Sequence, residues 1–160
     1  GYLTMKVAEL ATRRGLQTPA ALIGFSPLLS LNPDRTDKDV RRIDKIRETM
    51  LPAHRVEEIR ELWLPSGAVI EGFADPLHAS AYITSPVQLV AAEKEFFRPP
   101  TAGFSPLLTE TRGGVDLHLW RGQIHAFPMM AGVLADANLA IEIAAEFALA
   151  KIGERQGEPQ

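Results

Sequence analysis

Two histidines near the end of the sequence, His118 and His125, carry side chains well suited to proton-transfer chemistry. An unperturbed imidazole changes charge close to neutral pH, which makes histidine the most frequent general acid or base in enzymes. Asp116 precedes His118 by two residues, a spacing that places both side chains on the same face of a β-strand. Because a carboxylate beside an imidazole can orient it, this segment predicts general acid–base chemistry.

The segment GGVDLHLWRGQIHAFP predicts a β-hairpin that would bring the two histidines together. A two-residue turn at Arg121-Gly122 pairs His118 with His125, and directly opposed side chains lie about 5 Å apart at Cβ. The predicted site then has two groups, which are the catalytic residues His118, His125 and Asp116 and the ligand-binding residues Trp120, Gln123, Phe127 and Glu71.

Other interpretations of this hairpin face stay open. Paired histidines on a half-exposed strand can be purely structural, with the aromatic side chains covering a neighbouring helix. Two imidazoles can also share a metal ion, with a third ligand from Glu71, Asp75 or His78. We assign no metal ligand, and the sequence leaves the cofactor unknown.

The hexamer GFSPLL occurs twice, at residues 24–29 and 103–108, and each copy is followed by a Leu-Trp pair and a glycine-containing turn. The order of these matches predicts an internal duplication within a single domain 1–160, with halves at 17–97 and 101–153. Alternatively, the hexamer is a turn with apolar anchors that arose twice. Neither Ser26 nor Ser105 has a base beside it in sequence, so both are interpreted as structural.

Apolar periodicity and turn residues predict the remaining elements. Helices are expected from about residue 3 to Gly15, over 36–50, and over a largely buried C-terminal stretch that ends near Gly153. A second hairpin is expected around 61–73, a strand near 81–83, and a helix or strand over 87–97. The predicted fold class is therefore α+β, with an antiparallel sheet built of β-hairpins and packed by helices.

Composition narrows the functional classes. The chain has no cysteine, which excludes disulfides and thiol nucleophiles, and its net charge of −3 argues against general nucleic-acid binding. Neither a membrane-spanning run nor a signal peptide is visible, although a leader removed before Gly1 would leave no trace. A cytoplasmic location is the default expectation. Phosphate-loop, GxGxxG, HExxH and GxSxG strings do not occur.

Two functions remain compatible with the sequence. The first is a small soluble enzyme or ligand-binding domain that uses the paired-histidine face on an unidentified small molecule. The alternative is a non-catalytic interaction or assembly module, such as a homodimer, in which the face with Trp120 and Phe127 is an interface to a protein partner. A pocket around the histidines favours the enzyme, whereas a flat face favours the module.

Overall fold

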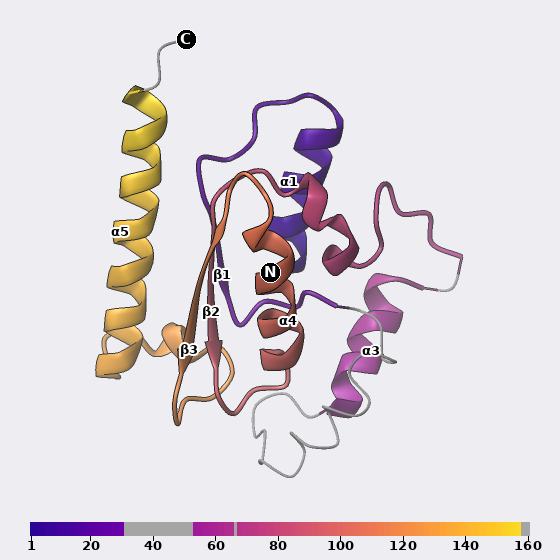
Figure 1. Cartoon of the computed structure of the whole chain (residues 1–160). Helices are drawn as coiled ribbons and strands as arrows, with labels where there is room; N and C mark the ends of the chain where they lie inside the picture. The colour runs from indigo at the N-terminus through magenta and orange to yellow at the C-terminus, as the bar shows by residue number, and fades with distance from the viewer. Residues whose placement is uncertain (31–52, 66, 158–160) are drawn as a thin grey trace.

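The computed structural model describes residues 1–30, 53–65 and 67–157, and its centre is a parallel three-stranded sheet (Figure 1). The strands lie in the order β1-β2-β3, and both neighbouring pairs are parallel. Their bounds are Leu22–Phe25 for β1, Val87–Ala92 for β2 and Val115–Trp120 for β3. All three strands therefore end at the same side of the sheet, which we call the carboxyl edge.

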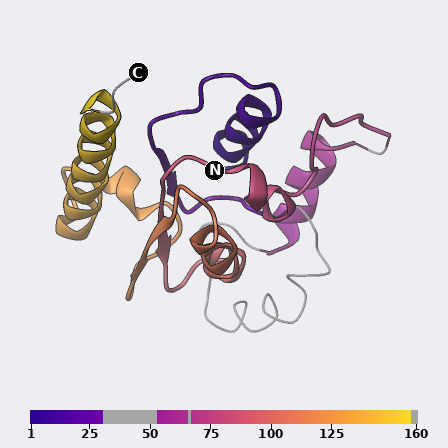
Figure 2. The same ribbon diagram turned by 45° about the horizontal axis from the view of Figure 1, so that its top comes forward.

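Helices cover both faces of this sheet, and a view turned by 45° shows the same three layers (Figure 2). Helices α1 (Tyr2–Arg13) and α4 (Arg98–Thr109) pack on one face, and α5 (Ala135–Gly157) packs on the other. Between β1 and β2 the chain forms α3 (Ala53–Trp63) and the 3₁₀ helix η2 (Pro76–Tyr82). A second 3₁₀ helix, η3 (Phe127–Met130), leads from the β3 end to α5.

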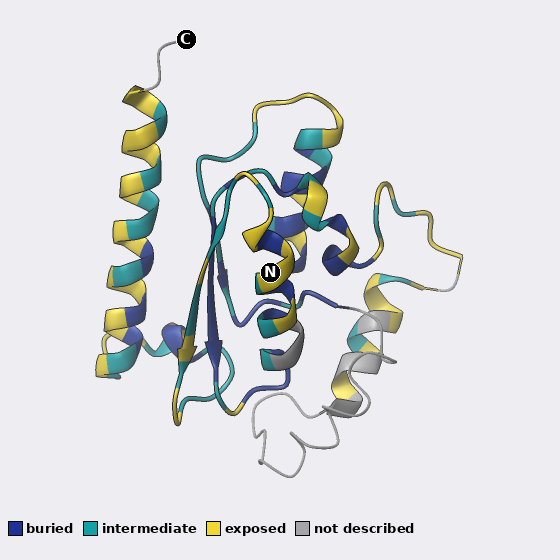
Figure 3. Cartoon of the chain, in the orientation of Figure 1, coloured by how far each residue is buried: buried dark blue, intermediate teal, exposed yellow. Residues whose placement is uncertain are grey.

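The apolar core is divided between the two sheet faces. One cluster joins Met5 of α1 and Phe104 of α4 to Leu89 of β2, and the other joins Phe127 and Ala140 to the opposite face of the sheet. Every residue of β2 is buried (Figure 3), which explains its nearly continuous apolar sequence VQLVAA. A central strand covered on both faces shows no polar alternation.

The predicted antiparallel hairpin sheet is wrong, because every strand pair is parallel. Residues 115–120 form a strand, but they pair with β2, where Gln88 is the register partner of Asp116 across 28 positions. Parallel neighbours need a long crossover, and α4 supplies it. The chain after Trp120 turns away instead of returning, and Ala126 has a left-handed backbone with φ 54° that is incompatible with an extended strand.

The two GFSPLL copies adopt different structures. In the first copy Gly24-Phe25 ends β1 and Ser26 follows the strand, whereas the second copy lies entirely inside α4. The expected hairpin at 61–73 is also wrong, since α3 continues to Trp63 and no strand follows it before η2 in the described part. The copies are thus not structurally equivalent, and the fold gives the pseudo-repeat no support.

Other expectations hold in part. The N-terminal helix is confirmed as α1, and β2 resolves the ambiguous 87–97 segment as a strand over its first six residues. The expected strand at 81–83 belongs instead to η2 and the residue that ends it. The C-terminal helix is present as α5, but its buried side is a narrow strip of Ala137, Ala140 and Ala144. The expected helix 36–50 lies outside the described residues.

Candidate active site

A buried carboxylate and a histidine meet at the carboxyl edge of the sheet. Glu95 Oε2 lies 3.2 Å from His125 Nδ1, and the second oxygen, Oε1, accepts a hydrogen bond of 3.0 Å from the Ala92 amide. The Glu95 side chain is 0% exposed and that of His125 is 21% exposed. The carboxylate is thus fixed by the strand end and by the imidazole, while the imidazole keeps contact with the surface.

The fold itself brings these two residues together. Glu95 comes three residues after the end of β2, and His125 comes five residues after the end of the neighbouring strand β3. Because parallel strands end at one edge, residues that follow adjacent strands lie close in space even when about thirty positions separate them. In open α/β sheets this edge is where ligands bind.

The orientation of the His125 ring suits it to accept a proton. In the tautomer that donates Nδ1–H to the carboxylate, the neutral ring has its lone pair on Nε2, and no described residue bonds that atom. The Phe97 ring packs against the imidazole in an edge-to-face contact with 5.3 Å between centroids. The pair is therefore an oriented base with a partly apolar surrounding.

Ser26 joins the loop of His125 to the end of β1. Its Oγ accepts a hydrogen bond of 2.9 Å from the Ala126 amide, and its own amide donates to the Val90 carbonyl at 2.7 Å. Ser26 is 6% exposed, and its φ of 44° lies in the left-handed region. The end of β1 thus contributes a buried hydroxyl to the same edge as Glu95 and His125.

Other contacts hold the first part of this loop. Glu93 Oε2 accepts a 3.0 Å bond from the Gly122 amide, and the Gln123 side chain donates to Asp136 Oδ2 at 2.6 Å. The Gly122 hydrogen bond holds the pKa of Glu93 below its ordinary value and outweighs the opposing effect of partial desolvation. The predicted ligand-binding residue Gln123 therefore acts, in this structure, as a tie between the loop and the start of α5.

His118 and Asp116 lie on β3 itself, and neither is bonded to Glu95 or His125. His118 Nε2 is 2.8 Å from Asp116 Oδ2, and the same oxygen accepts a 3.1 Å bond from Gln88 Nε2 on β2. Partial burial raises the pKa of the Asp116 carboxyl, but the hydrogen bonds from His118 and Gln88 outweigh it and leave the pKa below its ordinary value of 3.8. Without a hairpin, the predicted pairing of His118 with His125 is not formed.

The lowered Asp116 pKa predicts a pH-dependent stability contribution. A depressed folded-state pKa adds stability that is complete above about pH 4 and is lost as pH falls through the folded value. We expect Asp116→Asn to reduce the free energy of unfolding by less than about 1 kcal/mol near pH 6, because the side chain is half exposed. The difference should shrink as the pH is lowered below about 4, as measured by urea denaturation, and the exposed Glu146→Gln serves as the control.

The remaining predicted site residues have structural contacts. The Trp120 and Phe127 rings pack against each other at a tilt of 50° with 5.3 Å between centroids, and Phe127 is 0% exposed in the core beneath α5. Glu71 forms an exposed ion pair with Arg14, just past α1. That hydrogen bond lowers the Glu71 pKa and raises that of Arg14. None of these contacts places Glu71 beside His125.

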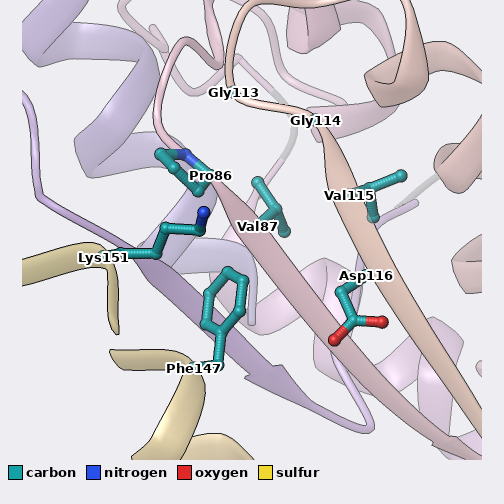
Figure 4. Close-up of a pocket in the computed structure, with 8 residues that line it drawn as sticks. All are labelled: Pro86, Val87, Gly113, Gly114, Val115, Asp116, Phe147 and Lys151. Carbon is teal, nitrogen blue, oxygen red and sulfur yellow. The ribbon is translucent and has the colours of Figure 1, made fainter. Parts of the chain in front are cut away.

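A half-open cavity of about 210 Å³ lies at the opposite end of the sheet, between the strand starts and α5 (Figure 4). Its lining includes Asp116 and the α5 side chains Phe147 and Lys151, but neither His118 nor His125. The pocket expected around a histidine pair is therefore not this one. Among the described residues, no cluster of three histidine or carboxylate side chains could hold a metal ion.

Comparison with known protein families decides the identity of this fold. Residues 1–129 match a family model described as the alpha/beta hydrolase fold, which is most of the chain. The chain belongs to the α/β hydrolase family. A search of curated protein sequences found no match.

Solved structures agree with this assignment at the level of the fold. An esterase from the bacterial hormone-sensitive lipase family has a TM-score of 0.79 at 19% identity, over 91% of this chain and 48% of that one. EstE7 from a metagenome library, a homologue of hormone-sensitive lipase, has a TM-score of 0.79 at 18% identity, over 94% of this chain and 51% of that one. An esterase/lipase from an uncultured bacterium has a TM-score of 0.73 at 19% identity, over 93% and 49%. The chain spans about half the length of these structures.

The α/β hydrolase fold favours the enzyme interpretation over the interaction module, but it does not support a mechanism based on a histidine pair in a hairpin. In this fold the triad follows the chain order Ser, then Asp or Glu, then His, and Glu95 and His125 have the order of the last two. No helix in the described part of the chain is long and apolar enough to cross a membrane.

Glu95 is the site residue absent from the sequence-based prediction. Its signal is a carboxylate placed just after the nearly continuous apolar strand VQLVAA, where the carboxyl edge of an α/β sheet carries its ligands. The ambiguity of segment 87–97 between helix and strand hides the strand end. His125 is predicted for its chemistry, but with the wrong partner.

Proposed function

We propose that this chain carries the carboxylate and the histidine of the catalytic triad of a serine hydrolase that cleaves carboxylic esters. The observation that carries the proposal is the buried Glu95 carboxylate bonded to His125 Nδ1 at the carboxyl edge. The esterase activity named for several structures of the same fold supports the choice of an ester over other acyl substrates. The substrate is therefore a small-molecule ester.

In the proposed reaction, His125 Nε2 takes the proton of a serine hydroxyl as the serine oxygen bonds to the acyl carbon. The resulting imidazolium gives that proton to the departing alkoxide oxygen when the ester C–O bond breaks. A water molecule then attacks the acyl carbon while His125 takes its proton, and the imidazolium returns that proton to the serine oxygen as the bond between the serine oxygen and the acyl carbon breaks, which releases the carboxylic acid. Glu95 takes no part in the proton transfer to substrate, because its role is to orient the ring and stabilise its charged form.

The nucleophilic serine of the proposed hydrolase is contributed by a part of the protein that precedes these 160 residues in sequence. In this fold that serine lies in a GxSxG turn and precedes the acid in chain order. The GxSxG string does not occur in the 160 residues, and these span about half of the matched esterase structures. Ser26 precedes Glu95 in sequence, but its buried Oγ is already engaged with the Ala126 amide.

The test uses the full-length protein, a p-nitrophenyl ester with a short acyl chain and a fluorophosphonate probe. We expect ester hydrolysis well above the spontaneous rate and labelling of one serine in a GxSxG sequence, located by mass spectrometry. The separate 160-residue chain should take up no probe. Absence of hydrolysis and labelling in the full-length protein, or a label within residues 1–160, would contradict the proposal.

A further inference from the structure

We infer that Ser26 is a positioning residue that holds His125 in its working orientation through the backbone of Ala126. This inference rests on the proposed function of His125. Ser26 is 100 positions from Ala126 in sequence, yet its Oγ accepts the Ala126 amide hydrogen at 2.9 Å. The bond therefore fixes the peptide unit that directly follows the catalytic imidazole.

Ser26 is itself firmly held. Its amide donates to the Val90 carbonyl at 2.7 Å, which ties it to the central strand β2, and its side chain is almost completely buried. The hydroxyl thus stands on the most buried part of the sheet. Because Ser26 is bonded to β2 through its amide and to Ala126 through its hydroxyl, it fixes the loop relative to the strands.

The backbone conformations on both sides of this bond point to function. Ser26 has φ 44° and Ala126 has φ 54°, and they are the non-glycine residues with positive φ in the described part of the chain. Residues other than glycine have a strained backbone in this region. Such strain persists where surrounding contacts impose it, frequently at active sites. Here the two strained residues are the donor and the acceptor of one hydrogen bond.

The other contacts of the loop engage groups other than the Ala126 amide. Glu93 fixes Gly122 and Asp136 fixes Gln123, so both hold the loop before His125. After His125, the Phe127 amide donates to the Ile124 carbonyl at 3.2 Å and the Met129 amide donates to the Ala126 carbonyl at 2.9 Å. The amide of the peptide that joins His125 to Ala126 is bonded to the Ser26 hydroxyl. Loss of that hydroxyl would leave these other bonds in place and free the amide of the peptide that directly follows the imidazole.

The experiment compares Ser26→Ala and Ser26→Gly with Ser85→Ala in the full-length protein. Ser85 is the matched control, because it is a buried serine whose hydroxyl also bonds to backbone, the Pro19 carbonyl, at the opposite end of the sheet. Ser26→Gly removes the hydroxyl and the φ strain together, so it keeps the test open if Ser26→Ala folds poorly.

We expect both Ser26 variants to lower kcat roughly 10- to 100-fold with little change in KM, since small displacements of a catalytic group have effects of this size. Hydrogen exchange of the Ala126 amide and modification of His125 by diethyl pyrocarbonate should both become faster. Ser85→Ala should change none of these, even if it lowers the melting temperature.

Unchanged Ala126 exchange, or a kcat equal to that of Ser85→Ala, would overturn the inference. So would fluorophosphonate labelling of Ser26, which would make it the nucleophile. The exchange and modification readouts do not depend on ester hydrolysis. If the full-length protein proves inactive on esters, the proposed function fails while these two measurements still decide the role of Ser26.

Discussion

Replacing His125 with alanine in the full-length protein should lower kcat/KM for ester hydrolysis by roughly 10³-fold, whereas His118→Ala should leave it almost unchanged. His125 Nδ1 is held by the buried Glu95 and its Nε2 lies at the carboxyl edge, where the reaction is proposed. His118 is bonded to Asp116 on the strand itself. The two variants remove the same ring from one chain, so each controls for the other.

The companion variants address folding. His125→Ala leaves the Glu95 carboxylate buried without its imidazole partner, which is destabilising. His125→Asn retains an N–H donor for that carboxylate but has no ring that can shuttle a proton, so it should be folded and inactive. Thermal melts and steady-state kinetics on the same samples separate these effects.

Glu95→Gln tests the second member of the pair. The amide keeps the shape of the side chain and can still accept from the Ala92 amide, but it cannot stabilise an imidazolium or enforce one tautomer. We expect kcat to fall by about 10³- to 10⁴-fold, as in other triads in which an amide replaces the acid. Equal activity losses for the His118 and His125 variants, or full activity in Glu95→Gln, would disprove the assignment of the pair.

Local patterns in the sequence predicted local features of this site. The proton-transfer residue His125, the N-terminal helix and the end of the strand at Trp120 can all be inferred from chemistry or short-range periodicity. The strand that pairs with β3 could not be inferred in this way. The alternation in VDLHLW is typical of any half-covered edge strand, and it does not distinguish a hairpin neighbour from a parallel strand 28 positions away.

Identical sequence also proved a poor guide to structure here. GFSPLL forms a strand end in one place and part of a helix in the other, because the flanking segments decide which backbone hydrogen bonds are available. Glu95 illustrates the same limit. Its importance comes from a contact with His125 that arises when two parallel strands end side by side, and no local pattern around Glu95 encodes that contact.

The ion cluster around the buried Glu9 on α1 should make a single substitution strongly destabilising. The Glu9 carboxylate is 1% exposed and receives hydrogen bonds from Lys6 at 2.9 Å, Arg13 at 2.9 Å and the Phe73 amide at 2.8 Å. Lys6 also donates to the Phe73 carbonyl, and Arg13 lies over the Phe73 ring. This cluster therefore anchors the segment before η2 to α1.

Glu9→Ala leaves an ammonium, a guanidinium and a backbone amide without their shared acceptor, so we expect the free energy of unfolding to fall by about 3 to 5 kcal/mol. Glu9→Gln keeps the volume and one acceptor oxygen, and it should cost about 1 to 3 kcal/mol. Urea denaturation measures both, with the exposed Glu142→Gln on α5 as the control. A Glu9→Ala chain within about 0.5 kcal/mol of the wild type would contradict this role.

Gly72 lies against the Glu9 carboxylate, so a substitution at Gly72 also tests this cluster. A Cβ on Gly72 would lie 2.1 Å from Glu9 Oε1, and the residue has φ 77°, so Gly72→Ala should also be strongly destabilising. Part of that cost is the clash with the Glu9 carboxylate, which Glu9→Ala removes, and part is backbone strain, which it does not. The double variant should therefore lose less stability than the sum of the single variants, by about 1 kcal/mol or more. Simple additivity would mean that Gly72 is required for its backbone conformation alone, and that the close approach of the loop to Glu9 contributes nothing to the choice of glycine.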